Sequence, residues 1–126
     1  MNHTKQKVLI VDDDQLLSQA LAQVFVNRGY DTQVLPTGND AEAIIESWNP
    51  DVILLDIMLP GKTGVEIVKD ISSKHKELCN KIVVMTTLED SEYLAQVLEL
   101  GVTHYVQKNT TNPEYVFEVA SRILNH

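Results

Sequence analysis

The sequence predicts an α/β fold of five strand–helix units, a (βα)5 doubly wound parallel sheet. Short runs of Val, Ile, Leu and Met alternate with segments whose apolar residues recur at helical spacing, and each pair fills about a fifth of the 126 residues. The runs at 8–11, 52–55 and 82–85 are apolar at every position, as expected for strands that helices cover on both faces.

End signals separate the first three units. Gly29 follows the apolar positions of the first helix and is a typical helix stop. A weaker strand at 32–35 leads to a short helix that ends at the Asn-Pro pair 49–50, because the residue before a proline disfavours the helical conformation. After the third strand, Thr63 and Glu66 form the pattern of a capping box and begin the next helix.

The last two units follow the same plan. The strand at 82–85 precedes a helix marked by apolar residues within 94–98, which stops at Gly101. The fifth strand contains residues 105–106. The Asn-Pro pair 112–113 then supplies a cap and a first helical residue for the last helix.

Composition limits the class of protein. A length of 126 residues with 44% apolar residues predicts a single domain over 1–126, with an ordered core of about 7–124. A net charge of -8 and the lack of any helix rich in Lys and Arg argue against nucleic-acid or membrane binding by this domain. The lone Cys79 fits a reducing compartment, and no apolar run reaches the ~20 residues of a membrane span. We therefore expect a cytoplasmic domain.

Polar residues stand at the ends of four predicted strands. Asp12 and Asp13 follow the first strand and Asp56 ends the third, whereas the fourth and fifth end in Thr86 and Lys108. Ligands of open parallel sheets bind at the carboxyl ends of the strands, near the point where the strand order reverses. In the flavodoxin-like order 2-1-3-4-5, the first and third strands are neighbours. The three carboxylates should therefore converge, with the hydroxyl and the ammonium group closing one side.

Three carboxylates in one pocket favour a bound cation. Two of them about 4 Å apart repel by roughly 4 kcal/mol at an effective dielectric constant of 20. Mg²⁺ or Mn²⁺ relieves that repulsion and keeps positions open for phosphoryl oxygens. Asp56 then stays ionised and can form an aspartyl-phosphate as a nucleophile, while Lys108 and Thr86 meet the charge on the transferred group. Each residue alone has a simpler interpretation, and for Asp14 we prefer that of a helix cap.

The same residues resemble the receiver domain of two-component response regulators, over nearly the whole chain. Val-Asp-Asp-Asp at 11–14 resembles the acidic metal-binding pair of that family. Leu-Leu-Asp-Ile-Met-Leu-Pro-Gly at 54–61, followed by Gly64, resembles the phosphoacceptor strand and its loop. Met-Thr at 85–86 resembles the hydroxyl site, and Tyr-Val-Gln-Lys at 105–108 resembles the aromatic switch residue followed by the lysine.

The resemblance implies a signalling phosphoacceptor that catalyses its own phosphorylation and dephosphorylation and is not otherwise an enzyme. Asp56 would accept the phosphoryl group from a phosphohistidine of a sensor histidine kinase or a phosphotransfer protein. Asp12 and Asp13 would bind Mg²⁺ together with Asp56 and the backbone carbonyl of Met58. Thr86 and Lys108 would contact the phosphoryl group.

The resemblance also implies a switch. Tyr105 would change rotamer as Thr86 moves, and this would reshape the face formed by the fourth helix, fifth strand and fifth helix, where a homodimer is a family expectation. Candidate contact residues on that face are Leu100, Val102, Tyr105, Tyr115 and Val116. Two positions depart from the family pattern: Thr87 replaces a small residue, and Asn109 replaces a common proline.

Two other functions remain open. A haloacid-dehalogenase-type phosphatase would use the acids Asp12 and Asp14, spaced one residue apart, but it needs a larger core and a cap and leaves Asp56 without a role. A degenerate receiver would keep the fold and bind a partner without being phosphorylated. The presence of every catalytic position argues against that second alternative.

Overall fold

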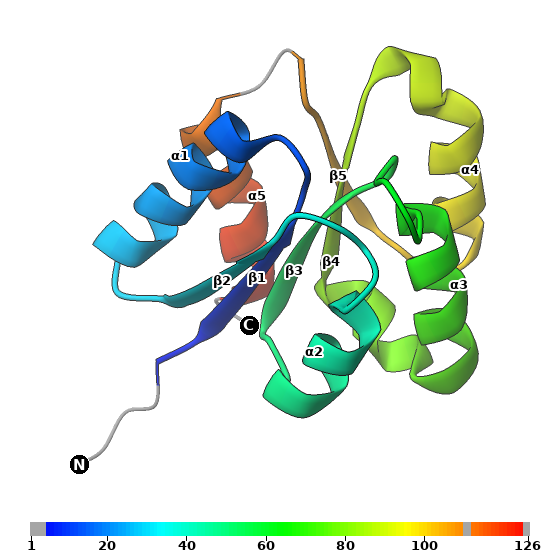
Figure 1. The fold of residues 1–126 in the computed structure, drawn as a ribbon, viewed down its shortest axis with the longest axis horizontal. Helices are drawn as coiled ribbons and strands as arrows, with labels where there is room; N and C mark the ends of the chain where they lie inside the picture. Colours follow the sequence, from blue (N-terminus) through cyan, green and yellow to red (C-terminus); the bar gives the residue numbers. More distant parts are fainter. Residues whose placement is uncertain (1–4, 110–111, 125–126) are drawn as a thin grey trace.

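A computed structural model describes residues 5–109 and 112–124. Five parallel strands form one sheet in the order β2-β1-β3-β4-β5, which confirms the predicted strand order (Figure 1). The strands are β1 (Lys7–Val11), β2 (Asp31–Leu35), β3 (Val52–Asp56), β4 (Ile82–Thr86) and β5 (His104–Gln107). The reversal of strand order lies between β1 and β3, where Val8 pairs with Val52 and Val11 with Leu55.

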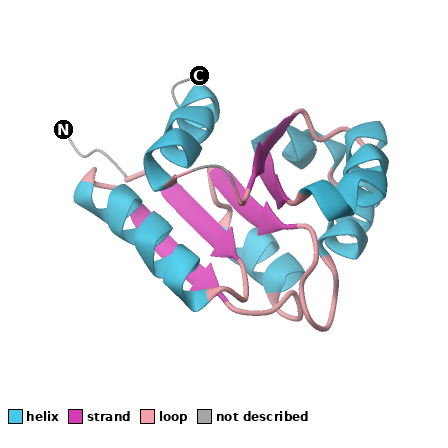
Figure 2. Cartoon of the chain, turned by 90° about the horizontal axis from the view of Figure 1, so that it is seen from above, coloured by secondary structure: helices cyan, strands magenta, loops and turns pink. Residues whose placement is uncertain are grey.

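Helices cover both faces of the sheet (Figures 1 and 2). They are α1 (Gln15–Asn27), α2 (Ala41–Trp48), α3 (Gly64–Lys74), α4 (Ser91–Glu99) and α5 (Pro113–Leu124). Buried side chains of α1 and α5 pack with one set of strand residues, and those of α2, α3 and α4 pack with the alternating set. This arrangement buries every residue of β3 and β4, and it explains why their sequences are continuous apolar runs up to a final polar residue.

The helix starts agree with the sequence signals. Asp14 caps α1 through its Oδ1, which accepts a hydrogen bond from the backbone N–H of Leu17 at 3.1 Å. Thr63 and Glu66 form the predicted capping box at the start of α3. Asn112 Oδ1 accepts from the N–H of Tyr115 at 2.9 Å, and Pro113 is the first residue of α5. These caps satisfy backbone N–H groups that the helices leave without internal partners.

Other local features were not predicted. Two 3₁₀ segments, η1 (Lys76–Lys81) and η2 (Leu88–Asp90), precede β4 and α4. Leu16, part of the apolar pattern of α1, is 83% exposed, so that helix buries mainly Leu21 and Phe25. The apolar periodicity thus marks the helix correctly but overstates the width of its buried face.

Candidate functional site

The carboxyl ends of four strands bring the predicted site residues together. Asp12 follows β1, Asp56 ends β3, Thr86 ends β4 and Lys108 follows β5. Asp12, Asp56 and Thr86 are at most 4% exposed, although each carries a polar side chain. Polar groups are rarely buried to this extent without a partner or a function. Among the described residues, the carboxyl ends of the strands thus hold buried polar side chains that the core elsewhere lacks, apart from Ser18.

The acidic cluster is compact. Carboxylate oxygens of Asp12, Asp13 and Asp56 lie within 4.8 Å of one another, and this is the one group of three such ligands in the described part of the chain. Asp12 Oδ1 accepts from the N–H of Asp14 at 3.0 Å, and Asp56 Oδ1 accepts from the N–H of Met58 at 3.1 Å. These two backbone bonds fix the orientation of both buried carboxylates.

Lys108 joins the buried acids. Its Nζ donates to Asp12 Oδ1 at 3.1 Å and to Asp56 Oδ2 at 3.2 Å. Its backbone N–H donates to the carbonyl of Thr86 at 2.7 Å, which ties the start of the β5–α5 loop to the end of β4. One ammonium group therefore contacts two of the three clustered carboxylates, so the acidic groups outnumber the basic one.

The donor atoms fit a hard divalent cation. Asp12 Oδ2 is buried and lacks a hydrogen-bond partner, whereas the other oxygen of that carboxylate has two. An unpaired anionic oxygen in a low-dielectric site is costly, and a metal ion would satisfy it. Because all three ligands are carboxylates, the set suits Mg²⁺ or Mn²⁺ better than metals that prefer thiolate or imidazole.

Electrostatics at Asp56 are strongly perturbed. Burial, and then the charge of Asp12, raise the pKa of Asp56 from 3.8 to about 7, although Lys108 opposes the change. Burial also works to lower the pKa of Lys108, but the charges of Asp56 and Asp12 outweigh it and the pKa lies above its ordinary value. Without a further cation, Asp56 thus keeps its proton to a much higher pH than an ordinary aspartate does.

Thr86 ends β4, and Tyr105 lies in the neighbouring strand β5. Thr86 Oγ1 donates to the backbone carbonyl of Thr87 at 3.1 Å, so its hydroxyl is engaged within its own loop. Tyr105, in β5, is half exposed. A pocket of about 280 Å³ separates this end of β4 and β5 from α4; it is lined by Thr86, Thr87, Ser91, Leu94, Tyr105 and Gln107. The pocket offers space for a side-chain rearrangement.

Gly64 allows the loop after β3 to fold back against the site. A Cβ atom on Gly64 would lie 2.4 Å from the backbone oxygen of Asp56 and 2.7 Å from the Cα of Ile57. The N–H of Gly64 donates to the carbonyl of Ile57 at 3.0 Å. The first residue of α3 is therefore in direct contact with the backbone that carries the candidate nucleophile.

Sequence reasoning missed two groups of side-chain contacts, one of them directly after Thr86. Thr87 and Asp90 form a capping box after β4, for which the Thr-x-x-Asp pattern was the available signal. Lys62, in the β3–α3 loop, contacts Glu42 of α2 and Asp70 of α3, and Glu42 also accepts from Lys74 at 2.5 Å. The second network has no sequence signal because its members are distant along the chain.

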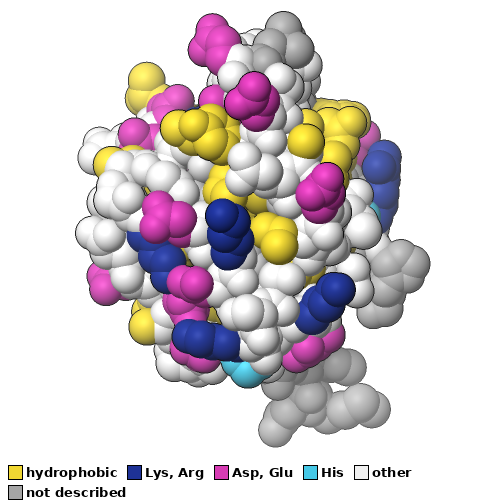
Figure 3. Space-filling view, turned by 90° about the vertical axis from the view of Figure 1, so that its right-hand side faces the viewer, with side chains coloured by type: hydrophobic (Ala, Val, Ile, Leu, Met, Phe, Trp, Pro, Cys, Tyr) yellow, Lys and Arg dark blue, Asp and Glu magenta, His cyan; other side chains and the backbone are white. Residues whose placement is uncertain are grey.

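The predicted contact residues divide into two groups. Val102 and Val116 are buried in the core and are not available at the surface, which corrects that part of the expectation. Tyr105 and Tyr115 are exposed, and Leu100 packs partly against the core. On the side of the molecule that carries α3 and α4, hydrophobic side chains lie among acidic and basic ones (Figure 3).

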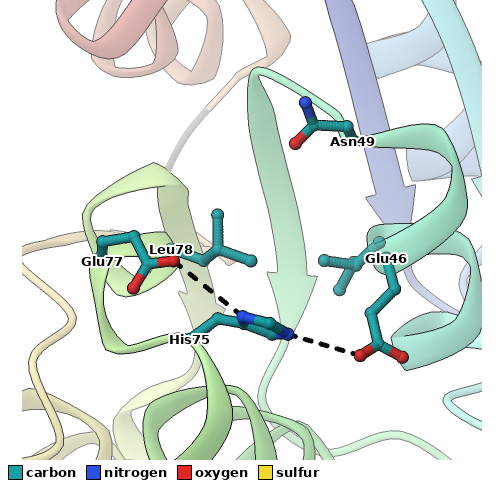
Figure 4. A pocket seen from close by; sticks show the side chains of 6 residues that line it. Glu46, Asn49, His75, Glu77 and Leu78 are labelled. Atoms are coloured by element: carbon teal, nitrogen blue, oxygen red, sulfur yellow. Dashed lines mark hydrogen bonds and ion pairs between the residues drawn. The ribbon is translucent and has the colours of Figure 1, made fainter.

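A second pocket lies at the C-terminal ends of α2 and α3, away from the acidic cluster. It measures about 370 Å³ and is lined by Ile45, Glu46, Asn49, His75, Glu77 and Leu78. His75 points between two carboxylates, with its Nε2 3.4 Å from Glu46 Oε2 and its Nδ1 4.0 Å from Glu77 Oε1 (Figure 4). Polar contacts between side chains as exposed as these contribute little to stability.

The comparisons with known proteins identify the family. Residues 8–120 match the response regulator receiver domain, and the chain belongs to this family of signalling domains. Receiver domains of response regulators are signalling domains of two-component systems, and the parallel sheet of this chain has the fold of a CheY-like receiver domain. This assignment favours the receiver interpretation over a haloacid-dehalogenase-type phosphatase.

Solved structures agree with the family. The chain is 31% identical to the BeF3-activated receiver domain of RstA from Klebsiella pneumoniae, with 96% of this chain and 100% of that one covered and a TM-score of 0.82. It is 27% identical to the chemotaxis response regulator CheY4 of Vibrio cholerae, at 95% and 99% coverage and a TM-score of 0.82. A CheY-like receiver domain from Methanospirillum hungatei shares the fold at 24% identity, 97% and 95% coverage and a TM-score of 0.85.

Among the described residues, no helix combines the length and the apolar character needed to cross a lipid bilayer.

Proposed function

We propose that this chain accepts a phosphoryl group on Asp56, in a Mg²⁺-dependent reaction, from a phosphohistidine of a sensor histidine kinase or a phosphotransfer protein. The observation that carries the proposal is the buried carboxylate of Asp56. It lies close enough to the carboxylates of Asp12 and Asp13 for all three to bind one metal ion, and its Oδ2 is 3.2 Å from Lys108 Nζ. Membership of the receiver family supports the same assignment.

Each residue has a defined part in the transfer. An oxygen of Asp56 forms the new bond to phosphorus while the bond to the imidazole nitrogen breaks; that nitrogen keeps the electron pair. Asp12, Asp13, Asp56 and the carbonyl of Met58 would hold Mg²⁺ or Mn²⁺, which supplies the positive charge that keeps Asp56 ionised. Lys108 moves from the carboxylate of Asp56 to a phosphoryl oxygen, where its charge is needed in the transition state.

The signal then passes to the surface. The hydroxyl of Thr86 exchanges the carbonyl of Thr87 for a phosphoryl oxygen, and Tyr105 turns into the pocket beside α4. Phosphorylation favours this packing because the phosphoryl group makes better contacts in it. The changed α4–β5–α5 face binds a downstream partner or a second copy of the chain.

Reaction with a small acyl phosphate tests the phosphoacceptor. In the presence of Mg²⁺, intact-mass measurement is expected to show the gain of one phosphoryl group on the wild type and none on Asp56→Asn. Chelation of the metal should also prevent the gain. A wild type that never gains mass would instead be a degenerate receiver, and a gain retained by Asp56→Asn would place the phosphoryl group elsewhere.

Metal binding has its own test, with a matched control. Asp12→Asn removes one anionic ligand, so we expect calorimetry to show at least about a tenfold loss of Mg²⁺ affinity. Asp14→Asn, two residues away, keeps a good helix cap and changes no residue of the cluster, so the affinity should stay as in the wild type. Equal losses in both variants would indicate a general effect of negative charge rather than ligation.

A further inference from the structure

Directly after β4, the side chain and the backbone of Thr87 form hydrogen bonds with Asp90 in a capping box. Thr87 Oγ1 donates to Asp90 Oδ2 at 2.9 Å, and the Thr87 N–H donates to the same oxygen at 3.4 Å. The N–H of Asp90 returns a bond to the Thr87 carbonyl at 3.1 Å. That carbonyl is also the acceptor of the Thr86 hydroxyl at 3.1 Å. Thr86 and the box therefore share one carbonyl oxygen.

The shared carbonyl links the box to the phosphorylation site. We propose that Thr87 and Asp90 are positioning residues that hold the Thr86 hydroxyl on the Thr87 carbonyl and so oppose the binding of a phosphoryl group at Asp56. The inference rests on the proposed function, because it concerns how readily Thr86 reaches that group. Among the described residues, neither Thr87 nor Asp90 forms a hydrogen bond with Asp56. Their effect on the phosphorylation site would therefore pass through Thr86.

The physical argument is one of competition. To donate to a group on Asp56, the Thr86 hydroxyl must leave its present acceptor, and that acceptor is held in place by the box. A contact present only in the resting arrangement shifts the equilibrium away from the arrangement that binds the phosphoryl group. A small residue at position 87, as the family pattern has, lacks the hydroxyl that closes the box. The restraint is therefore a property of this chain.

The affinity for trifluoroberyllate, a phosphoryl analogue, measures this bias directly. A side-chain cap contributes about 1 kcal/mol, which corresponds to a factor of about five in an equilibrium constant. Calorimetric titration with beryllium and fluoride in Mg²⁺ is therefore expected to show about fivefold tighter binding by Asp90→Ala and by Thr87→Val. Both changes remove the hydrogen bond between Thr87 Oγ1 and Asp90 Oδ2, and Asp90→Ala also removes the acceptor of the Thr87 N–H. The double variant should therefore gain no more than Asp90→Ala alone.

Conservative variants separate this role from simpler ones. Thr87→Ser keeps the hydroxyl and Asp90→Asn keeps an acceptor oxygen while removing the charge, so both should bind trifluoroberyllate as the wild type does. Equal or weaker binding by Asp90→Ala and Thr87→Val would overturn the inference. Tightening by Asp90→Asn equal to that by Asp90→Ala would also overturn it, because charge would then be the cause. A wild type that binds no trifluoroberyllate would instead contradict the proposed function itself.

Discussion

In EDTA at pH 8, the Asp56→Asn variant is expected to have a free energy of unfolding about 2 to 4 kcal/mol above that of the wild type. The reason is the burial of an ionised carboxylate beside that of Asp12, which raises the pKa of Asp56 from 3.8 to about 7. Each pH unit between these two values corresponds to about 1.4 kcal/mol, so the full difference is slightly above about 4 kcal/mol, and partial relaxation of the site would reduce it. Asparagine removes the charge and keeps the shape. Urea unfolding followed by the fluorescence of Trp48, the single tryptophan, measures the effect.

The same pKa predicts how the gain depends on pH. In the unfolded chain Asp56 releases its proton near pH 4, whereas in the folded protein it does so near pH 7. Between these values the folded state binds more protons, so the stability of the wild type falls as the pH rises through this window and levels off above it. The advantage of Asp56→Asn should therefore be absent near pH 4, grow up to about pH 7 and be complete at pH 8.

Two further measurements, one with added Mg²⁺ and one on a surface variant, test this explanation. Saturating Mg²⁺ stabilises the ionised wild type and should reduce the advantage of Asp56→Asn. Asp40→Asn changes an exposed aspartate that makes no side-chain capping bond, and it should alter stability by less than about 0.5 kcal/mol at any of these pH values. A wild type as stable as Asp56→Asn in EDTA at pH 8 would mean that the buried carboxylates do not repel as the geometry indicates.

The position of the site was predictable because it depends only on the strand order and on the alternation of strands and helices along the chain. Two apolar runs end in Asp56 and Thr86, and two others are followed by Asp12 and Lys108. In a parallel sheet of order 2-1-3-4-5, all four residues then lie at the carboxyl ends of the strands. The caps at Asp14 and Thr63 were predictable because a cap involves only neighbours in sequence. Local chemistry and topology were thus sufficient for the fold and for the positions of the candidate site residues.

Orientation was not predictable in the same way. The partner of the Thr86 hydroxyl depends on the path of the loop after β4. The exposure of Leu16 depends on which side of α1 faces the sheet, because the buried Ser18, Leu21 and Phe25 lie on the opposite side of the helix. Val102 and Val116 were candidates for the surface because buried and exposed apolar residues have the same sequence signal. Side-chain direction follows from tertiary packing, which a hydrophobic pattern does not encode.

Gly64→Ala is expected to destabilise the protein by about 2 to 4 kcal/mol, although alanine is the better helix former. In an open helix position this change would stabilise by up to about 1 kcal/mol. At Gly64, however, the new Cβ would lie 2.4 Å from the Asp56 carbonyl oxygen and 2.7 Å from the Ile57 Cα, which are backbone atoms that cannot rotate away. The start of α3 or the end of β3 must shift, and overpacking of this kind typically costs about 1 to 3 kcal/mol or more. Urea unfolding measures the loss.

Gly29 provides a control that separates loss of stability from misplacement of Asp56. Gly29 has a φ of +90°, and a Cβ added there would have no neighbouring atom within 4 Å, so Gly29→Ala loses stability only through backbone strain, about 1 kcal/mol. Because Gly29 ends α1 far along the chain from Asp56, Gly29→Ala should react with acyl phosphate as the wild type does. Gly64→Ala moves the backbone that carries Asp56, so under native conditions its phosphorylation should slow at least about tenfold. A Gly64→Ala variant that is stable and reacts normally would show that the close contact is not required to position the nucleophile.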